Sequence, residues 1–371
     1  MMRVALVHDW LTGMRGGERV LEGLLGLFPA ADIFTLVHVP GSVTPAIEAR
    51  PIRPSFIQRL PGAPRRFRQY LPLFPLAVRG FDLRGYDLVL ATSHCIAVGA
   101  RPPAAASHVV YCFTPMRYAW TFEGAYVGRV PPLARGPLRV ALAALRRWDR
   151  AAGRRAGHLA CISRHVAARI RRVWGREARV VYPPVRTALF RPVEPGELGD
   201  TYLCLSALTP YKRVDVAVDA CTRLGRRLDV IGTGPELPRL RRRAGPTVRF
   251  LGWQPDEAVR QAVTRCRAFL FPGEEEFGIA PLEATAAGRP VIAYGRGALS
   301  ETVVDGVTGL FFREQTADAL IDAVERGEVT GWSAEKIRAH ALRFGEEAFQ
   351  AEMTAFVTAA LEAGQQARAA C

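Results

Sequence analysis

The sequence predicts an α/β protein made of two Rossmann-like domains, each with its own parallel sheet. Short apolar runs of strand length alternate with helix-like stretches along the chain, and the alternation restarts after Pro183-Pro184. Strands separated by helices pair in parallel through right-handed β-α-β units. With 371 residues, of which 49% are apolar, the chain is long enough for two hydrophobic cores.

The strands follow from the apolar runs, taken in chain order. In the first domain we expect strands at Val4–Val7, Asp32–Leu36, Leu88–Ala91, His108–Cys112, Leu159–Ile162 and Val180–Tyr182. In the second domain we expect them at Tyr202–Ser206, Leu228–Ile231, Val248–Leu251, Ala268–Phe271, Val291–Ala293 and Gly309–Phe312. Regular structure is interrupted around 183–197 by four prolines, which places the domain boundary there.

Three segments result from this division. Residues 1–185 form the first domain and residues 186–345 the second. Residues 346–371 hold an amphipathic helix, Glu346–Ala367, with its apolar residues at helical spacing. We expect this helix to cross back and pack on the first domain.

Composition limits the location and the partners. No apolar run approaches the roughly 20 residues of a membrane span, and the chain opens with a strand in place of a signal peptide. The seven cysteines are scattered and form no C-x-x-C pair. Buried cysteines in a reducing compartment are therefore expected, and with them a soluble, cytoplasmic protein.

Charge differs sharply between the two halves. Residues 1–185 hold 27 Arg, no Lys and 10 acidic residues, a net charge of +17, whereas residues 186–371 have a net charge of −2. The basic half could meet nucleic acid, an anionic membrane surface or a phosphate-bearing substrate, or could reflect compositional bias alone. No nucleic-acid-binding signature accompanies the charge, so nucleic acid is not expected. The Arg-rich stretch Val140–Arg155 suits either a membrane surface or an ordinary helix with its apolar face in the core.

Lysine is almost absent, which makes the two that occur informative. The chain has 50 basic residues, and only Lys212 and Lys336 among them are lysines. Lys336 lies in an ordinary surface-helix pattern, but Lys212 lies in the turn that follows the first strand of the second domain. With Arg213 beside it, this flexible ammonium could neutralise a diphosphate without any metal ion.

Glycines mark two turns that could approach an anion. Gly16 and Gly17 precede a helix after the first strand, and Gly232 and Gly234 follow a strand of the second domain. Backbone N–H groups at a helix start favour negative charge. The first turn lacks the G-x-G-x-x-G spacing, so a nicotinamide or flavin fingerprint is absent. Plain tight turns remain the alternative in both places.

Two carboxylates are the most informative pair in the chain. Glu275 and Glu283 are separated by seven residues, between the strand Ala268–Phe271 and a helix, where ligands of open α/β sheets bind. Carboxylates accept hydrogen bonds from sugar hydroxyls, and amides of the helix start suit phosphate, so a nucleotide sugar is expected. A glycosidase acid/base pair is the alternative. Glu274 and Glu276 are expected to be solvated neighbours.

These motifs resemble glycosyltransferase family 4, the retaining enzymes of the GT-B fold, most strongly from 206 to 312. The resemblance implies two sheets facing across a cleft, a nucleotide sugar as co-substrate, GDP-mannose by preference, and no metal or other cofactor. By resemblance, Glu275 contacts the sugar hydroxyls, Glu283 the ribose, and Lys212 with Arg213 the diphosphate; Lys212, Arg213 and Glu275 are the implied catalytic residues. The remaining implied donor-binding residues are Gly16, Gly17, Gly234, Phe277, Gly278 and Ile279.

The first half resembles a narrower branch, the mannosyltransferases that build O-antigen and exopolysaccharide. Gly16–Arg19, Thr92–His94 and Tyr111–Tyr118 are similar to that branch. It implies acceptor-binding roles for His94, Arg117 and Tyr118. For the basic half, the net charge of +17 motivates a separate hypothesis: a glycan or polyprenyl-diphosphate-linked glycan acceptor at the membrane, with the basic domain in a peripheral position on the anionic cytoplasmic membrane face.

The chain departs from that pattern at three positions. Phe113 stands where the branch usually has His, Thr121 where it often has Asp, and Ala207 where the family has an Arg before the phosphate lysine. Two other classes stay open: a GT-B-shaped sugar-nucleotide epimerase, which needs no acceptor, and a weakly active transferase-like scaffold.

Overall fold

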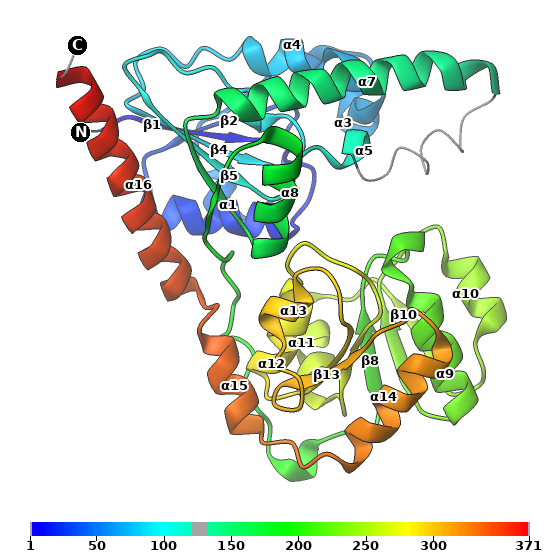
Figure 1. Cartoon of the computed structure of the whole chain (residues 1–371). Coiled ribbons are helices and arrows are strands. Elements are labelled where there is room, and N and C mark those ends of the chain that lie inside the picture. The colour runs from blue at the N-terminus through cyan, green and yellow to red at the C-terminus, as the bar shows by residue number, and fades with distance from the viewer. Residues whose placement is uncertain (1, 121–131, 370–371) are drawn as a thin grey trace. The chain divides into compact units, whose positions relative to one another are not determined.

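The computed structural model describes residues 2–120 and 132–369, which form two units (Figure 1). Unit 1 is Met1–Pro184 with Phe349–Cys371, and unit 2 is Val185–Ala348. Each is built around a wholly parallel sheet, which confirms the prediction of two Rossmann-like domains. Thr121 lies outside the described residues.

Unit 1 has a seven-stranded sheet in the order β3-β2-β1-β4-β5-β6-β7. Its strands are β1 (Val4–His8), β2 (Asp32–Thr35), β3 (Ile52–Pro54), β4 (Leu88–Ser93), β5 (Ser107–Cys112), β6 (His158–Cys161) and β7 (Arg179–Val180). Its α-helices are α1 (Gly16–Leu27), α2 (Pro45–Glu48), α3 (Ala63–Arg66), α4 (Phe74–Arg79), α5 (Arg117–Trp120), α7 (Pro132–Arg155) and α8 (Arg164–Trp174). Short 3-10 helices are η1 (Phe56–Arg59), η2 (Phe67–Leu73) and η3 (Ala97–Gly99).

Unit 2 has a six-stranded sheet in the order β10-β9-β8-β11-β12-β13. Its strands are β8 (Tyr202–Leu205), β9 (Leu228–Ile231), β10 (Val248–Gly252), β11 (Phe269–Phe271), β12 (Val291–Tyr294) and β13 (Gly309–Phe312). Its α-helices are α9 (Val214–Leu224), α10 (Leu237–Arg243), α11 (Asp256–Arg265), α12 (Ile279–Ala286), α13 (Leu299–Thr302), α14 (Ala317–Val329) and α15 (Ala334–Leu342). The 3-10 helices η4 (Pro195–Glu197) and η5 (Pro210–Lys212) lie in its loops.

Strand order reverses once in each sheet. In unit 1 the chain moves from β1 to β2 in one direction and from β4 to β5 in the other, so the reversal falls between β1 and β4. In unit 2 the corresponding reversal falls between β8 and β11. In open α/β sheets, ligands bind at the carboxyl ends of the strands that flank such a reversal.

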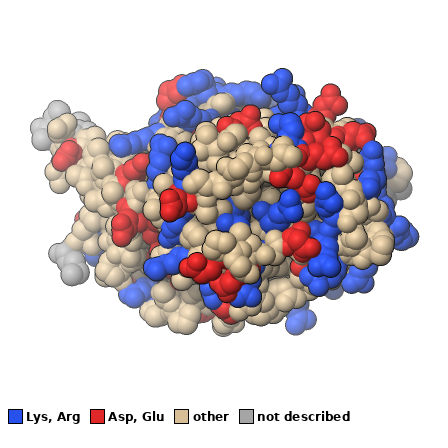
Figure 2. Space-filling view, turned by 90° about the horizontal axis from the view of Figure 1, so that it is seen from below, with Lys and Arg blue, Asp and Glu red and all other residues tan. Residues whose placement is uncertain are grey.

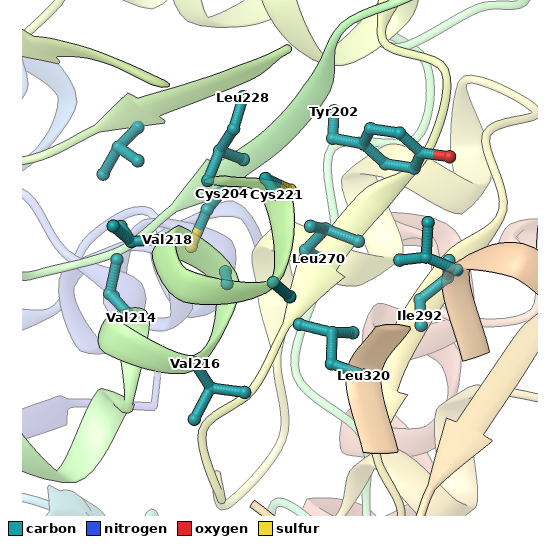
Figure 3. Packing of buried hydrophobic residues seen from close by; sticks show 14 of the residues in the cluster. Tyr202, Cys204, Val214, Val216, Val218, Cys221, Leu228, Leu270, Ile292 and Leu320 are labelled. Atoms are coloured by element: carbon teal, nitrogen blue, oxygen red, sulfur yellow. The ribbon is translucent and has the colours of Figure 1, made fainter. Parts of the chain in front are cut away.

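The core of unit 2 explains why its strands read as continuous apolar runs. Alternate residues of β8 face opposite sides of the sheet: Tyr202 and Cys204 pack with α9 and α14, while Leu203 packs with residues of the other cluster, which includes α12 (Figure 3). Both faces are buried, so no polar alternation is needed. The six cysteines among the described residues are all free and buried, as expected.

The C-terminal helix α16 (Glu346–Ala369) joins unit 1 from Phe349 onward. Its residues Phe349, Met353, Phe356 and Val357 are buried. The ring of Phe349 meets Tyr111 edge-on, with 5.9 Å between centroids. This apolar stripe covers α1 and the end of β5, which explains the helical spacing seen in the sequence.

One strand, β3, was not predicted from the sequence. It spans three residues at the sheet edge, and both Arg53 and Pro54 are exposed. An edge strand that is short and ends in proline buries too little apolar surface to give a periodic signal.

The Arg-rich segment lies in α7 and places two of its leucines in the interior. Leu142 and Leu145 are buried, as the ordinary-helix interpretation expects, while Val140 is 71% exposed. In the described part of the chain, no helix is both long and apolar enough to cross a membrane. α7 also buries Asp149, whose Oδ2 accepts hydrogen bonds from Trp120 Nε1 at 2.7 Å and Trp174 Nε1 at 2.8 Å.

Burial raises the pKa of Asp149 to about 6, against the opposing effect of the two indole N–H donors. The folded protein therefore keeps Asp149 protonated at pH values at which the unfolded chain ionises it. The contribution of Asp149 to the free energy of unfolding is complete below pH 4 and is lost as pH rises through 6. We expect Asp149→Asn to gain stability relative to wild type between pH 4 and 6, by at most about 3 kcal/mol. Urea unfolding followed by tryptophan fluorescence measures this, and a constant difference across that pH range would contradict it.

Candidate functional site

The turn after β8 carries the lysine that the sequence singled out. It runs from Ser206 through η5 to α9 and holds Lys212, whose side chain is 15% exposed. Thr209 Oγ1, in the same turn, is buried and has no hydrogen-bond partner among the described residues. A buried hydroxyl without a partner is uncommon and is typical of a ligand or water site.

Lys212 and Glu275 form an ion pair across the point where strand order reverses. Nζ of Lys212, after β8, contacts Oε1 of Glu275, after β11, and Glu275 is also 15% exposed. The ammonium lies 5.4 Å from the ring centroid of Tyr211 and 5.8 Å from that of Phe271. Two opposite charges at this depth are held by their own attraction and by the aromatic faces.

Arg213 is in an unusual conformation and is bound locally. Among the described non-glycine residues, Arg213 is the one that has a positive φ, 51°. Holding a side-chain-bearing residue in this conformation costs about 1–3 kcal/mol, and strain of this kind is found at functional sites. Its guanidinium donates to Asp215 Oδ1 at 3.1 Å and to the Gln315 carbonyl at 3.0 Å. The structure therefore places Arg213 beside Lys212 in the chain, with its side chain engaged by Asp215 and Gln315.

Gly232 and Gly234 bring the turn after β9 against the turn after β8. A Cβ on Gly232 would lie 1.9 Å from the Ser206 carbonyl oxygen, and one on Gly234 would lie 2.3 Å from the Leu208 carbonyl oxygen. Leu208 N–H in turn donates to the Thr233 carbonyl at 2.9 Å. Packing between two backbones thus accounts for both glycines, whatever binds there.

The acidic turn after β11 ends at the start of α12. Gly278 has a φ of 90° and caps the helix, and Ile279 begins it. The amides of a first helical turn have no intrahelical acceptor, so they can receive an anion. The turn is fixed from the other side by Ala298, whose N–H donates to the Glu275 carbonyl at 2.9 Å.

Glu283 lies in α12 and is 8% exposed. Arg186 Nη2 lies 3.7 Å from its Oε1, and the same guanidinium contacts Asp256 at 3.4 Å. Arg186 therefore supplies positive charge next to the carboxylate expected to meet a ribose.

One residue of the acidic turn differs from the sequence interpretation. Glu276 was expected to be solvated, but it is only 8% exposed; Glu274 is exposed as expected. Phe277, expected at the donor, is buried and meets Phe344 edge-on at 6.1 Å. The turn therefore buries two consecutive side chains, those of Glu276 and Phe277, and leaves Glu274 exposed.

In unit 1 the expected residues gather at the carboxyl ends of β1, β4 and β5. A Cβ on Gly17 would lie 3.4 Å from both the His8 and Phe113 rings, and Phe113 lies 6.2 Å from His94 between ring centroids. Gly16 opens α1. Arg117 and Tyr118 are half-buried on α5, which follows β5.

Sequence reasoning missed the buried polar residues beside these positions. His8 and Asp9 are 1% and 0% exposed, and Glu18 is 5% exposed. A signal was present, because His8-Asp9 directly follows an apolar strand, at the edge where ligands bind.

Some of the charges on the surface of unit 2 are paired. Arg249 pairs with Asp229 at 2.7 Å and Arg226 with Glu328 at 2.7 Å, and Figure 2 shows acidic and basic side chains intermixed over one face. No cluster of three or more metal-ligating side chains occurs among the residues that the structure describes.

Comparison with known proteins finds a family match within the second unit. Residues 199–327 match the family described as glycosyl transferases group 1. The region that matches includes Lys212, Glu275 and Glu283.

Curated relatives match half of this chain or less. Glycogen synthase of Pseudomonas aeruginosa is 35% identical over 177 residues, which are 45% of this chain and 33% of that protein. The GDP-mannose-dependent α-(1-6)-phosphatidylinositol monomannoside mannosyltransferase of Mycobacterium tuberculosis is 32% identical over 194 residues, 44% of this chain and 50% of that protein. The chain thus matches a third to a half of the length of these relatives.

Solved structures share the fold along almost the whole chain. The Anabaena protein Alr3699/HepE, in complex with UDP and glucose, has a TM-score of 0.72 at 17% identity, covering 96% of this chain and 100% of its own. Sucrose-phosphate synthase from Thermosynechococcus elongatus has a TM-score of 0.76 at 19% identity, covering 98% and 100%. The chain therefore has the fold of the GT-B glycosyltransferases.

The glycine contact gives a test of how the turn is built. Because a Cβ at position 234 would overlap the Leu208 carbonyl, we expect Gly234→Ala to lower the free energy of unfolding of unit 2 by about 1–3 kcal/mol. Gly196→Ala is the matched control, since a Cβ there meets nothing within 4 Å, and its change should stay within about 0.5 kcal/mol. Chemical denaturation measures the free energy of unfolding of both variants. Equal changes would show that the contact between Gly234 and the Leu208 carbonyl does not account for the loss of stability.

Proposed function

We propose that this protein is a retaining glycosyltransferase that moves a hexose from a nucleotide sugar to a glycan or lipid-linked glycan. The observation that carries the proposal is the Lys212–Glu275 ion pair at the reversal of strand order in unit 2, within a matched glycosyl transferases group 1 domain. We propose mannose from GDP-mannose as the donor, and synthesis of a cell-surface polysaccharide as the setting.

The chemistry of unit 2 suits the three parts of a nucleotide sugar. Lys212 offers a point charge to the diphosphate, and the amides at Gly278 and Ile279 offer donors to it. Glu275, once its ammonium partner turns to phosphate, can accept hydrogen bonds from sugar hydroxyls. Glu283, deeper in α12, is the acceptor for the ribose.

Stabilising the leaving diphosphate is the main work of such a site. The bond between the anomeric carbon and the phosphate oxygen breaks as the acceptor hydroxyl attacks on the same face, and the departing phosphate oxygen takes the hydroxyl proton. This route needs no protein nucleophile and no metal, because Lys212 opposes the developing negative charge.

The names of the relatives support a nucleotide-sugar donor more strongly than they support any particular sugar. The mycobacterial relative is named for GDP-mannose, whereas the Anabaena structure holds UDP and glucose and another relative is a glycogen synthase. GDP-mannose also agrees with the resemblance of the first half to mannosyltransferases.

Loss of either partner of the ion pair should disable turnover. We expect Lys212→Ala and Glu275→Gln each to reduce nucleotide release by more than about tenfold, because one removes the diphosphate charge and the other the sugar acceptor. Lys336→Ala, the other lysine of the chain and an exposed one on α15, is the control and should keep the wild-type rate.

The assay is a panel of GDP- and UDP-sugars with purified protein, with and without lipid extract, reading nucleotide release and thermal shift. GDP-mannose should give the largest signals. Silence across the panel would count against a transferase, and release without any acceptor dependence would favour the epimerase or scaffold alternatives. Wild-type rates in both site variants would remove the pair from the mechanism.

A basic and apolar surface on unit 1 supports a membrane-bound acceptor. The elements η1, α3, η2 and α4 contact one another and expose apolar side chains beside arginines. The apolar members are Phe56, Leu73 and Leu76, and the exposed arginines are Arg59, Arg65, Arg66, Arg68 and Arg79. Arg79 lies near enough to lower the pKa of Arg101, with burial and Arg155 contributing, which shows that positive charge accumulates there.

We propose that this surface, the η1–α4 surface, rests on anionic lipid, and vesicle flotation tests it. Wild type should float with phosphatidylcholine vesicles that contain phosphatidylglycerol and not with phosphatidylcholine alone. Arg65→Gln with Arg66→Gln should weaken binding by about thirtyfold, since each arginine near the surface contributes about 1 kcal/mol. Arg241→Gln with Arg242→Gln, an exposed pair at the end of α10, is the matched control; an equal loss there, or flotation independent of anionic lipid, would contradict the proposal.

A further inference from the structure

Gln315 lies in the loop between β13 and α14 and bonds to two other loops of unit 2. Its side-chain Nε2 donates a hydrogen bond to the carbonyl of Pro272 at 2.8 Å. Its backbone carbonyl accepts a hydrogen bond from Arg213 Nη2 at 3.0 Å. Pro272 begins the acidic turn that follows β11, and Arg213 ends the turn that follows β8. One half-buried residue therefore contacts both of the turns that carry the Lys212–Glu275 ion pair.

Strand pairing does not by itself explain these contacts. β13 pairs with β12, and β12 pairs with β11, so two strands separate β13 from β8. At the usual spacing of neighbouring strands, β13 and β8 are about 14 Å apart. Phe312 ends β13 and Thr316 caps α14, so the connection between them is short. The contacts of Gln315 thus link this short loop to a turn that leaves the sheet three strands away.

The acidic turn is held at both of its ends. Pro272 is buried, and its carbonyl accepts the hydrogen bond from the Gln315 amide. At the other end, the Glu275 carbonyl accepts a hydrogen bond from Ala298 N–H at 2.9 Å. A buried carbonyl that loses its donor is costly, so loss of the Gln315 amide favours movement of the turn toward water or another donor. Glu275 would move with the turn that carries it.

The turn after β8 depends on the same residue because its backbone is strained. Arg213 has a φ of 51°, and its guanidinium is held by Asp215 Oδ1 at 3.1 Å as well as by the Gln315 carbonyl. The two turns also touch directly. A Cβ on Gly273 would lie 3.1 Å from both the Cα and the carbonyl oxygen of Lys212. A shift of either turn therefore displaces the other.

We infer that Gln315 is a positioning residue for the Lys212–Glu275 ion pair. It fastens the turn after β8 and the turn after β11 to one point, so that Nζ and Oε1 face each other before any ligand is bound. Charge that is already in place opposes a developing charge better than charge that must first be reoriented. The effect on turnover rests on the proposed function, whereas the effect on the ion pair does not.

The scarcity of lysine makes the ion pair observable by NMR. The chain has two lysines, so protein with isotope-labelled lysine gives the signals of Lys212 and Lys336, and Lys336→Ala assigns them. Glu275→Gln removes the partner of Lys212 and gives the position of its Cε–Hε signal without the ion pair. Gln315→Met keeps the length of the side chain but removes the donor. The Lys212 signal should then move toward its position in Glu275→Gln, while the Lys336 signal stays in place.

Thr316→Ala is the matched control, because Thr316 is the next residue of the same loop. Its Oγ1 accepts a hydrogen bond from Ala319 N–H at 3.3 Å, which caps α14. Loss of this cap should lower the midpoint of thermal unfolding about as much as Gln315→Met does, but leave the Lys212 signal at its wild-type position. An unmoved Lys212 signal in Gln315→Met, or an equal movement in Thr316→Ala, would overturn the inference.

Turnover separates the positioning role from the proposed function. With the panel of GDP- and UDP-sugars, Gln315→Met should lower kcat about fivefold, the factor that one hydrogen bond contributes, and leave the donor KM within about twofold. Thr316→Ala should keep the wild-type kcat, and a wild-type kcat in Gln315→Met would also overturn the inference. If wild type transfers no sugar, the proposed function fails, but movement of the Lys212 signal in Gln315→Met would still support the positioning role.

Discussion

The reversal of strand order in two parallel sheets is the constraint on which both candidate sites depend. At the reversal, two strands that lie side by side come from distant parts of the chain. Residues far apart in sequence therefore meet at the carboxyl ends of these strands. In unit 2 this brings Lys212 to Glu275, and in unit 1 it brings Asp9 to His94. Each sheet thus holds one pair of an acidic and a basic side chain at the point where its strand order reverses.

The two pairs differ in what they leave available. Lys212 and Glu275 satisfy each other, so a ligand must supply a better partner for each: phosphate for the ammonium and hydroxyls for the carboxylate. Asp9 is already saturated by three backbone N–H groups and by Nδ1 of His94. A ligand in unit 1 would therefore meet groups other than the Asp9 carboxylate.

Sequence patterns predicted the fold well because parallel strands buried on both faces are short continuous apolar runs. Each strand was located from such a run except β3, whose exposed edge position carries no apolar signal. Spacing and residue type also singled out Lys212 and Glu275, but spacing along the chain cannot show that Nζ and Oε1 meet across 63 positions. The prediction that Glu276 is solvated was wrong for a related reason. Burial of a side chain in a loop follows from how the loop closes, not from the polarity of the residue.

Asp9 is a residue that the strand order, added to the sequence pattern, would have identified. Its sequence context, a polar pair at the end of a buried strand, is visible, but its importance comes from accepting N–H groups of residues 94 to 97. Those contacts exist only because β4 pairs beside β1, a neighbour relation that alternation alone leaves open. Once the strand order is known, a carboxylate after β1 has to face the loop after β4, and a histidine in that loop becomes oriented. The Asp9–His94 pair therefore depends on topology more than on any motif.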